Sequence, residues 1–225
     1  VELRGNYLVN GDVYFNNTTG SGLTTSGGGT ISGETDNGTH IPPLPAVDDR
    51  IEAALNTTAG ANHNNRTDVI QNNVTTLSTG ETETLESPGV YYLDSLNVPQ
   101  DATLVLDTSS GDIVIAVEGN VDVAPGAEIR VQGDGQARMF VGGESDDQLS
   151  LDSSRVGVHN GSQYTNRSDG FWFYCKSGCS GEFLDGSQFT GVVYGPGDAG
   201  GEFGIGRDSE VFGALAVDRI DTTAG

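Results

Sequence analysis

The chain has 225 residues and carries 32 acidic against 10 basic side chains, for a formal net charge of -22. Leu, Ile, Val and Phe supply 53 residues, about 24% of the chain, which exceeds the roughly 20% below which chains tend to be disordered. The charge argues against nucleic acid as a partner, because phosphates would be repelled. No stretch approaches the roughly 20 apolar residues of a membrane helix, so we expect membrane attachment only through an anchor outside this chain.

Residues 1–40 are expected to form short N-terminal strands interrupted by glycine. Residues 7–9 and 13–15 are apolar and flank Asn10-Gly11-Asp12, which is typical of a hairpin or a corner. Glycine-rich turns follow over residues 20–33.

Residues 41–80 are expected to form a proline-rich connector and a helical insertion. Residues 41–45 contain three prolines and predict a stiff, extended connector. A helix is predicted over about 46–56, with Asp48 and Asp49 in the first turn, where the helix dipole favours carboxylates. Its apolar positions at helical spacing are Val47, Ile51, Ala54 and Leu55. Residues 57–80 are polar and predict a loop with a short helix through Val69 and Ile70.

The sequence pattern of residues 81–225 predicts one long all-β segment. Short apolar strands alternate with corners rich in Gly, Asp, Asn and Ser, and the spacing is too tight for helical crossovers. The expected strands are 91–98, 103–107, 113–117, 121–124, 129–131, 138–141, 170–175, 182–184, 189–194 and 211–217.

An internal repeat indicates the architecture of this segment. Ser187-Gln-Phe-Thr-Gly191-Val-Val-Tyr aligns with Ser209-Glu-Val-Phe-Gly213-Ala-Leu-Ala at an offset of 22 residues, and Ala127-Glu-Ile-Arg-Val131 is a looser copy. A period in the low twenties, with glycine at the corners, is typical of one coil of a β-solenoid. We therefore expect residues 1–225 to form a single all-β domain, a parallel β-helix with a short helical insertion. A β-sandwich of short strands is the alternative.

Four apolar segments that begin with glycine are Gly89-Val-Tyr-Tyr-Leu93, Gly111-Asp-Ile-Val-Ile-Ala-Val117, Gly191-Val-Val-Tyr-Gly-Pro196 and Gly213-Ala-Leu-Ala-Val217. Through these segments, residues from about 85 to 220 resemble a β-solenoid domain of haloarchaeal pilin-like surface proteins and of bacterial proteins tied to type IV pilus assembly. The proline-then-helix segment at 41–56 resembles that family's usual insertion. The resemblance implies fold and cell-surface location and brings no catalytic residues. The chain departs from the family in its acidic richness, its CxxxC loop and the lack of an N-terminal pilin helix.

The charge pattern favours a halophilic source, and the resemblance to haloarchaeal surface proteins implies an archaeal one. In molar salt the Debye length falls to about 3 Å, so repulsion between carboxylates is largely screened. A dense acidic coat then keeps a protein soluble and monomeric. Lys176 is the only lysine, which fits the same environment, because the long apolar stem of lysine is a liability under salting-out conditions.

Eight Asn-x-Ser/Thr sequons place the chain outside the cell, on the cell surface. With 15 asparagines in the chain, chance would give about two or three such matches. The alternative is that asparagine and threonine simply gather in turns. The N-glycosylation candidates are Asn16, Asn17, Asn37, Asn56, Asn65, Asn73, Asn160 and Asn166.

The two cysteines lie in Cys175-Lys-Ser-Gly-Cys179, which lacks the CxxC spacing of zinc sites. In an extracellular chain we expect a small disulfide loop, and two buried free thiols are the alternative. The chain starts and ends abruptly, so we expect an ectodomain whose signal or anchor has been removed.

Motifs for known chemistry are missing, so neither a cofactor nor a metal site is expected. The sequence contains no GxSxG, HExxH or GxxxxGK[ST]. His40, His63 and His159 fall in separate polar turns and are expected at the surface. The acidic corners at 107–112 and 133–135 are expected to be ordinary turns, with calcium binding as the alternative. The aromatic run 171–174 is expected to be a strand with alternate rings in the core, with a sugar-stacking platform as the alternative.

These observations predict a non-enzymatic, extracellular structural module of a pilin-like or envelope-associated protein that presents a glycosylated, acidic surface. Its expected partners are further copies of itself or other surface proteins. An adhesin that binds carbohydrate or a partner surface through one solenoid face is the alternative. A glycan-active β-helix enzyme ranks third, because one lysine and nine scattered arginines disfavour lyase chemistry. Glycoside hydrolysis needs only two carboxylates, and 32 acidic residues supply such a pair by accident, so their number decides nothing.

Overall fold

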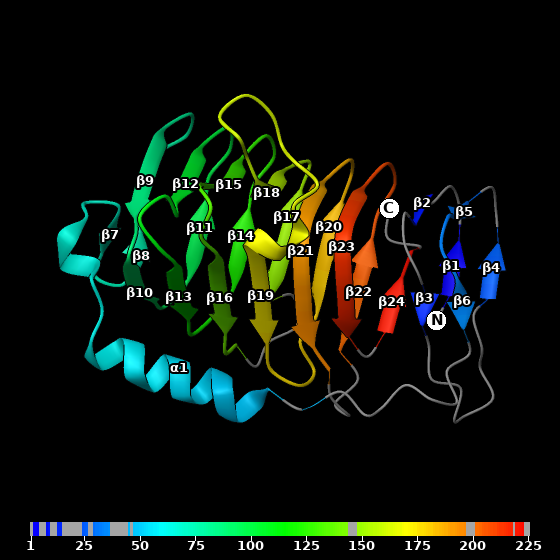
Figure 1. The fold of residues 1–225 in the computed structure, drawn as a ribbon, viewed down its shortest axis with the longest axis horizontal. Helices are drawn as coiled ribbons and strands as arrows, with labels where there is room; N and C mark the ends of the chain where they lie inside the picture. The colour runs from blue at the N-terminus through cyan, green and yellow to red at the C-terminus, as the bar shows by residue number, and fades with distance from the viewer. Residues whose placement is uncertain are drawn as a thin grey trace.

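The computed structural model describes residues 2–4, 8–9, 13–14, 24–26, 29–36, 45, 47–143, 148–196, 201–217 and 219–222. The chain forms a β-solenoid of about five turns with one helix on its outer surface (Figure 1). Neighbouring strands in the two large sheets are parallel, which confirms the expected β-helix and excludes a sandwich of hairpins.

Each complete coil contributes strands to three faces of the solenoid. Face A holds β11 (Leu96–Val98), β14 (Val121–Val123), β17 (Leu149–Asp152), β20 (Gly181–Leu184), β22 (Glu202–Ile205) and β24 (Arg219–Asp221). Face B holds β9 (Thr82–Glu86), β12 (Thr103–Asp107), β15 (Glu128–Gln132) and β18 (Arg155–Val158). Face C holds β10 (Gly89–Leu93), β13 (Ile113–Val117), β16 (Ala137–Val141) and β19 (Phe171–Cys175). Two long strands continue from face B into face C with no loop between the faces, β21 (Gln188–Gly195) and β23 (Glu210–Val217).

The strand register confirms the sequence repeat. Gln188 pairs with Glu210 and Gly191 with Gly213, which reproduces the offset of 22 residues. The looser copy lies in the same column two coils earlier, because Glu128 pairs with Arg155 and Arg155 with Gln188. The coil that includes β18 is longer, since a loop of residues 159–170 is inserted between β18 and β19.

The core is built from the alternate residues of each strand that point into the coil. Phe183 is fully buried, with its ring centroid 5.3 Å from Phe189 and 6.0 Å from Phe203. Glycine is required where strands turn from face B to face C. Gly213 has φ +138, and a Cβ there would lie against the carbonyl oxygen of Gly191. The repeated glycine therefore serves packing of one coil on the next.

The serine that opens each repeat also has a structural reason. Ser187 is fully buried at the corner between faces A and B, and its hydroxyl donates to the carbonyl oxygen of Leu151 at 2.9 Å. Ser209 occupies the same position one coil later and donates to Phe183 O at 3.0 Å. A small hydroxyl side chain thus fits the tight corner and satisfies a buried carbonyl.

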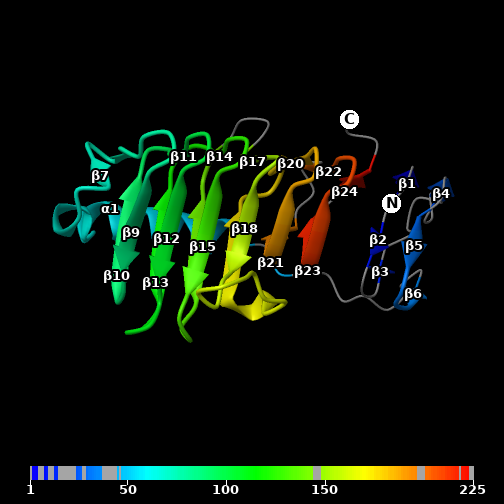
Figure 2. The ribbon, with the colours of Figure 1, turned by 90° about the horizontal axis from the view of Figure 1, so that it is seen from above.

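The N-terminal strands stack on the C-terminal end of the solenoid (Figure 2). Face A continues in the order β22-β24-β1-β4, with every pairing parallel. The described parts of the two apolar runs, residues 8–9 and 13–14, form separate short strands that pair in parallel with later strands and not with each other, so the expected hairpin is not formed. The strands of this segment are β1 (Glu2–Arg4), β2 (Leu8–Val9), β3 (Val13–Tyr14), β4 (Thr24–Ser26), β5 (Thr30–Ile31) and β6 (Thr35–Asp36).

The helix α1 (Asp48–Gly60) lies along the outer surface of face C (Figure 1). It extends four residues beyond its predicted end at 56. Val47 and Ile51 are buried against Phe140, and Leu55 packs on the same cluster. Within the described residues, no helix combines the length and the apolar character that crossing a membrane requires.

The predicted short helix through Val69 and Ile70 is wrong. These residues lie at a hairpin of β7 (Ile70–Gln71) and β8 (Val74–Thr75), preceded by the 3₁₀ turn η1 (Asn64–Arg66). The two connecting asparagines, Asn72 and Asn73, have φ of 50° and 60°, a left-handed conformation that asparagine tolerates and that makes a tight turn. Turn chemistry therefore overrides the weak helical spacing.

The segment 61–80 also caps the first coil. The amide of Asn64 donates to Tyr92 O at 2.6 Å and accepts from Tyr92 N–H at 3.1 Å, as a neighbouring strand would. The backbone N–H of His63 donates to Val90 O at 2.7 Å. The edge of β10 is thereby closed, which removes a template for edge-to-edge association.

Candidate functional site

The most elaborate surface feature is the loop of residues 159–170, here called the sequon loop because it contains Asn160 and Asn166. It projects beside β18 and β19 and ends in the 3₁₀ turn η2 (Ser168–Gly170) (Figure 2). Both asparagines are exposed.

The first half of the loop folds back on itself for local reasons. The side-chain oxygen of Asn160 accepts the N–H groups of Ser162 at 3.0 Å and Gln163 at 2.9 Å, which is an Asx turn. The N–H of Thr165 donates to Val158 O at 2.8 Å, so the chain returns to the strand that it left.

Tyr164 anchors this half of the loop to face B. Its hydroxyl donates to Glu128 Oε2 at 2.9 Å, and its ring lies edge-on to His159 at 5.1 Å. Burial, and then the charge of Glu128, raise the pKa of Tyr164 well above its usual range. Burial acts to raise the pKa of Glu128, but hydrogen bonds from Arg130 and Tyr164 outweigh it, so the net pKa is lowered. An ionised carboxylate therefore holds the tyrosine in place.

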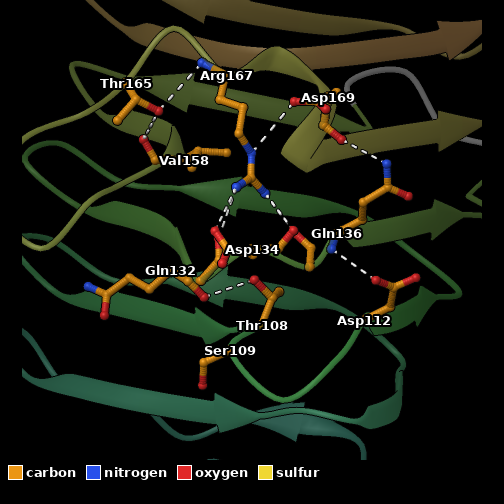
Figure 3. A network of polar contacts seen from close by, with 12 residues as sticks. Thr108, Ser109, Asp112, Gln132, Asp134, Gln136, Val158, Thr165, Arg167 and Asp169 are labelled. Atoms are coloured by element: carbon orange, nitrogen blue, oxygen red, sulfur yellow. Dashed lines mark hydrogen bonds and ion pairs between the residues drawn. The ribbon is translucent and has the colours of Figure 1, made fainter.

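Arg167 anchors the second half, with its guanidinium directed at the corner that carries Asp134 (Figure 3). It donates to Gly135 O at 2.8 Å, to Gly133 O at 3.1 Å and to Asp134 O at 3.3 Å. Its contacts to the carboxylates of Asp134 and Asp169 are longer, at 3.8 and 3.6 Å. The 133–135 corner, considered above for calcium, thus directs its carbonyl oxygens at a cation of the chain itself.

The neighbouring acidic corner at 107–112 is also engaged within the protein. Asp107 accepts the N–H of Ser109 at 2.9 Å, and Asp112 accepts Gln136 N–H at 3.0 Å. The second oxygen of Asp112 binds Arg138 at 2.8 Å. In the described part of the chain, no cluster of three or more His, Cys, Asp or Glu side chains is placed to hold a metal ion.

The structure separates the five sequons that lie in its described residues by accessibility. Asn160 and Asn166 are exposed on the sequon loop, and Asn65 is exposed in η1. Asn56 is exposed on α1, but its sequon threonine, Thr58, is buried and donates to Ala54 O. Asn73 is half-buried, and its side-chain oxygen accepts a hydrogen bond from Asn64. The candidates Asn16, Asn17 and Asn37 lie outside the described residues.

The side chains of the aromatic run 171–174 alternate between the core and the outer surface, as predicted. Phe171 and Phe173 are buried in the core, whereas Trp172 and Tyr174 point outward from face C and stack with ring centroids 5.7 Å apart. Tyr174 is covered by α1, with Arg50 over its ring at 5.9 Å. Trp172 remains half-exposed beside the sequon loop, and its indole N–H donates to Asp169 O at 3.1 Å.

A shallow hollow separates α1 from strands β10 and β13. Two carboxylates, Glu52 and Glu118, face it together with Tyr92. The Tyr92 hydroxyl donates to Glu118 Oε2 at 2.6 Å, and this hydrogen bond raises the pKa of Tyr92 to about 12. The hollow is also lined by Leu55, Asn56 and Ala59.

Cys175 and Cys179 form a disulfide, as predicted, and both side chains are buried. The bridged loop contacts the first turns of α1. The N–H of Ser177 donates to Asp48 Oδ1 at 2.8 Å, and Lys176 lies 3.3 Å from Glu52. The bridge therefore fixes a corner to which the helix is attached.

The expectation of surface histidines is wrong for His159, which is buried under the sequon loop. Burial and the nearby charge of Arg130 lower its pKa. His63 is half-buried, and its ring nitrogen accepts the N–H of Val90 at 3.3 Å. His40 lies outside the described residues.

Sequence reasoning missed the side chains that anchor the loop, Tyr164, Arg167 and Glu128. The available signal was the composition: Arg167 is one of only 10 basic residues and sits inside a sequon, between Asn166 and Ser168. A scarce cation in an acidic chain is a candidate for a structural contact.

A family model described as a domain of unknown function, DUF7305, matches residues 27–225. The match covers α1 and every strand of faces A, B and C from β9 to β24, and the first strands, up to Ser26, lie outside it. No curated protein and no solved structure matches the chain.

Proposed function

We propose that this chain, which belongs to the DUF7305 family, is a non-enzymatic structural module on the outside of a halophilic archaeal cell. The observation that carries the proposal is the sequon loop, which contains two exposed acceptor asparagines. Hydrogen bonds of Arg167 and Tyr164 attach this loop to the solenoid. A rigid scaffold with fixed acceptor sites suits the display of glycans.

The surface charge supports the same proposal. None of the described Asp and Glu side chains is buried, so the negative charge is distributed over the outside of the solenoid. Such a coat attracts hydrated cations and opposes association in high salt. The disulfide is compatible with an oxidising, extracellular location.

Intact mass of the full-length protein from its native host, measured without reduction, tests this function. We expect excess mass in hexose-sized steps and the two-proton deficit of one disulfide. Glycopeptide mapping should assign the sugar to Asn160 and Asn166 and leave Asn73 bare, because the Asn73 amide is engaged by Asn64. A bare polypeptide mass would overturn the display function. Electron microscopy of the host surface then tests whether the module belongs to filaments.

Matched variants separate the loop from the remaining sequons. Replacing Asn160 and Asn166 with glutamine should remove the mass of two glycans, whereas Asn73→Gln should leave the excess mass unchanged. The reverse pattern would show that exposure on the folded solenoid does not select the modified sites.

Carbohydrate binding at Trp172 is the second candidate, because this ring is half-exposed and outward-facing on a flat strand surface. Trp172 pairs with Arg138 on the neighbouring strand β16. The guanidinium of Arg138 donates hydrogen bonds to Gln136 and Asp112, so polar groups lie beside the position of the ring. A glycan array should give a saturable hit that Trp172→Ala abolishes and that Phe212→Ala, a half-exposed ring on β23, leaves intact. Turnover of any polysaccharide, lost with one carboxylate change such as Glu118→Gln, would overturn both functions.

A further inference from the structure

The tip of the sequon loop places an asparagine directly before a glycine. Asn160 and Gly161 are both exposed, and they lie between His159 and Tyr164, which form an antiparallel bridge. An asparagine side chain can form a five-membered imide with the peptide nitrogen that follows it, and glycine, which has no Cβ, hinders this attack least. The space beside Gly161 is open, since a Cβ built there would meet no atom within 4 Å.

His159 places a base at this peptide nitrogen. The N–H of Gly161 donates to Nδ1 of His159 at 3.0 Å, inside the range of about 2.6–3.2 Å over which a general base takes a proton. An accepting Nδ1 carries no hydrogen, so the ring is neutral, with its proton on Nε2. The ring is buried and lies edge-on to Tyr164, with centroids 5.1 Å apart. The proton on the attacking nitrogen is therefore directed at a base whose position is already fixed.

The surroundings of the ring favour its neutral form. Burial, and then the charge of Arg130, lower the pKa of His159, while Glu128 acts in the opposite direction. Tyr164 also faces the ring, and its raised pKa keeps its hydroxyl uncharged at neutral pH. A lowered pKa leaves the imidazole in its basic form at neutral pH.

Two backbone donors hold the side-chain oxygen of Asn160. Its Oδ1 accepts the N–H groups of Ser162 at 3.0 Å and Gln163 at 2.9 Å. Both distances fall in the range of about 2.7–3.1 Å that is typical of an oxyanion hole. The ring of atoms closed by the Ser162 hydrogen bond contains both Cγ of Asn160 and the Gly161 nitrogen, so the turn folds the side chain back over the peptide that would attack it.

We propose that the sequon loop converts Asn160 through a cyclic imide, with His159 as the general base and the N–H groups of Ser162 and Gln163 as oxyanion donors. The Gly161 nitrogen bonds to Cγ of Asn160 while His159 takes the proton of that nitrogen. The bond from Cγ to Nδ2 then breaks, and Nδ2 receives the proton and leaves as ammonia. One water molecule opens the imide at either carbonyl and leaves aspartate or isoaspartate at position 160.

The conversion competes with glycan attachment at the same atom. Both reactions use Nδ2 of Asn160, so a converted copy has lost this acceptor and has gained one carboxylate. Imide formation needs only the folded loop and water, and it therefore does not rest on the display function proposed above.

Incubation of full-length protein from a host that adds no glycan tests the conversion. Peptide mapping by mass spectrometry follows aspartate and isoaspartate at Asn160 and separates this site from the Asn-Gly pairs at 10–11 and 37–38. A synthetic peptide of residues 156–165 in the same molar salt is the reference, because it holds neither the base nor the donors in place. We expect Asn160 to react at least about tenfold faster in the folded protein, since a positioned base alone contributes ~10²–10⁴-fold. An equal or slower rate in the folded protein would overturn the proposal.

His159→Asn separates the base from the turn. An asparagine oxygen can accept the Gly161 N–H in place of Nδ1 but is not basic, so the rate at Asn160 should fall at least about tenfold. His63→Asn is the matched control and should leave the rate unchanged, because Nδ1 of His63 also accepts a backbone N–H, that of Val90 on β10. A rate in His159→Asn equal to or above that of the wild type would refute the role of His159.

The pH profile gives a readout that a purely structural role of His159 would not move. The peptide should react about tenfold faster for each unit of pH, because hydroxide is its base. In the folded protein the rate at Asn160 should change less than about twofold between pH 7 and 8, because His159 is already neutral there. A rise in the folded protein as steep as that of the peptide would show that hydroxide removes the proton, which contradicts the proposal.

Discussion

Replacing Arg167 with alanine removes the contacts that hold the second half of the sequon loop. The guanidinium donates to three backbone carbonyls, at 2.8, 3.1 and 3.3 Å, and the side chain is 33% exposed. Because the corner at 133–135 is only partly buried, water can replace the lost donor. Each bond is then worth its net contribution of about 0.5–1.5 kcal/mol.

The two shorter bonds and a weaker third give about 2–3 kcal/mol for the loop. The carboxylate contacts at 3.6 and 3.8 Å add little, because exposed ion pairs are worth less than about 1 kcal/mol and are screened by salt. Since 1.4 kcal/mol corresponds to a factor of ten, amide hydrogen exchange at residues 165–170 should accelerate about 30- to 150-fold.

Hydrogen exchange followed by mass spectrometry measures this acceleration peptide by peptide. Arg155→Ala is the matched control, because Arg155 is an exposed arginine on the neighbouring strand β18. Exchange in the strands of face A should stay unchanged in both variants. Equal protection of residues 165–170 in the wild type and in Arg167→Ala, or equal loss in Arg155→Ala, would refute the assignment of Arg167 as the anchor.

Three further predictions concern the solenoid itself. Phe183→Ala removes a fully buried ring that contacts Phe189 and Phe203, so chemical denaturation should show a loss of about 3–5 kcal/mol, and a loss below about 1 kcal/mol would contradict the packing. The hydrogen bond to Glu118 raises the pKa of Tyr92 to about 12, so ultraviolet titration of Glu118→Gln should show one tyrosine shifted back towards its ordinary value of about 10. A raised tyrosine pKa stabilises the folded state below pH ~10 and loses that contribution as the pH rises through about 12, a loss that Glu118→Gln should abolish. Transfer from molar salt to dilute buffer should lower the melting temperature through carboxylate repulsion, and an unchanged value would remove the argument for halophilic adaptation.

The fold could be predicted largely because each coil of a solenoid repeats the same short pattern of strands and corners in the sequence. Alternation along each strand, glycine at Gly191 and Gly213 and the 22-residue offset all arise from one coil stacking on the next. Several strands were missed, namely β9, β17, β18, β22 and β24, because they are short or rich in polar residues. Each has at most three buried residues, which is too few to form a recognisable alternation.

The hairpin of β7 and β8 shows a different limit. Val69 and Ile70 have a weak helical context, but the positive φ angles at Asn72 and Asn73 close a tight turn, and the two apolar side chains are buried at the end of the core. A short apolar pair does not identify its element, since packing decides whether a turn or a helix forms around it.

By itself the sequence determined the local features of this protein: the solenoid period, the inward and outward alternation at residues 171–174, and the disulfide between cysteines four residues apart. Only the tertiary structure decided which distant residues meet. Tyr164 lies against Glu128, 36 residues away, and β1 pairs with β24 at the opposite end of the chain. The physical reason is that neighbours across coils depend on the length of every insertion between them. A local pattern gives the coil, but the sum of the coil lengths sets the register.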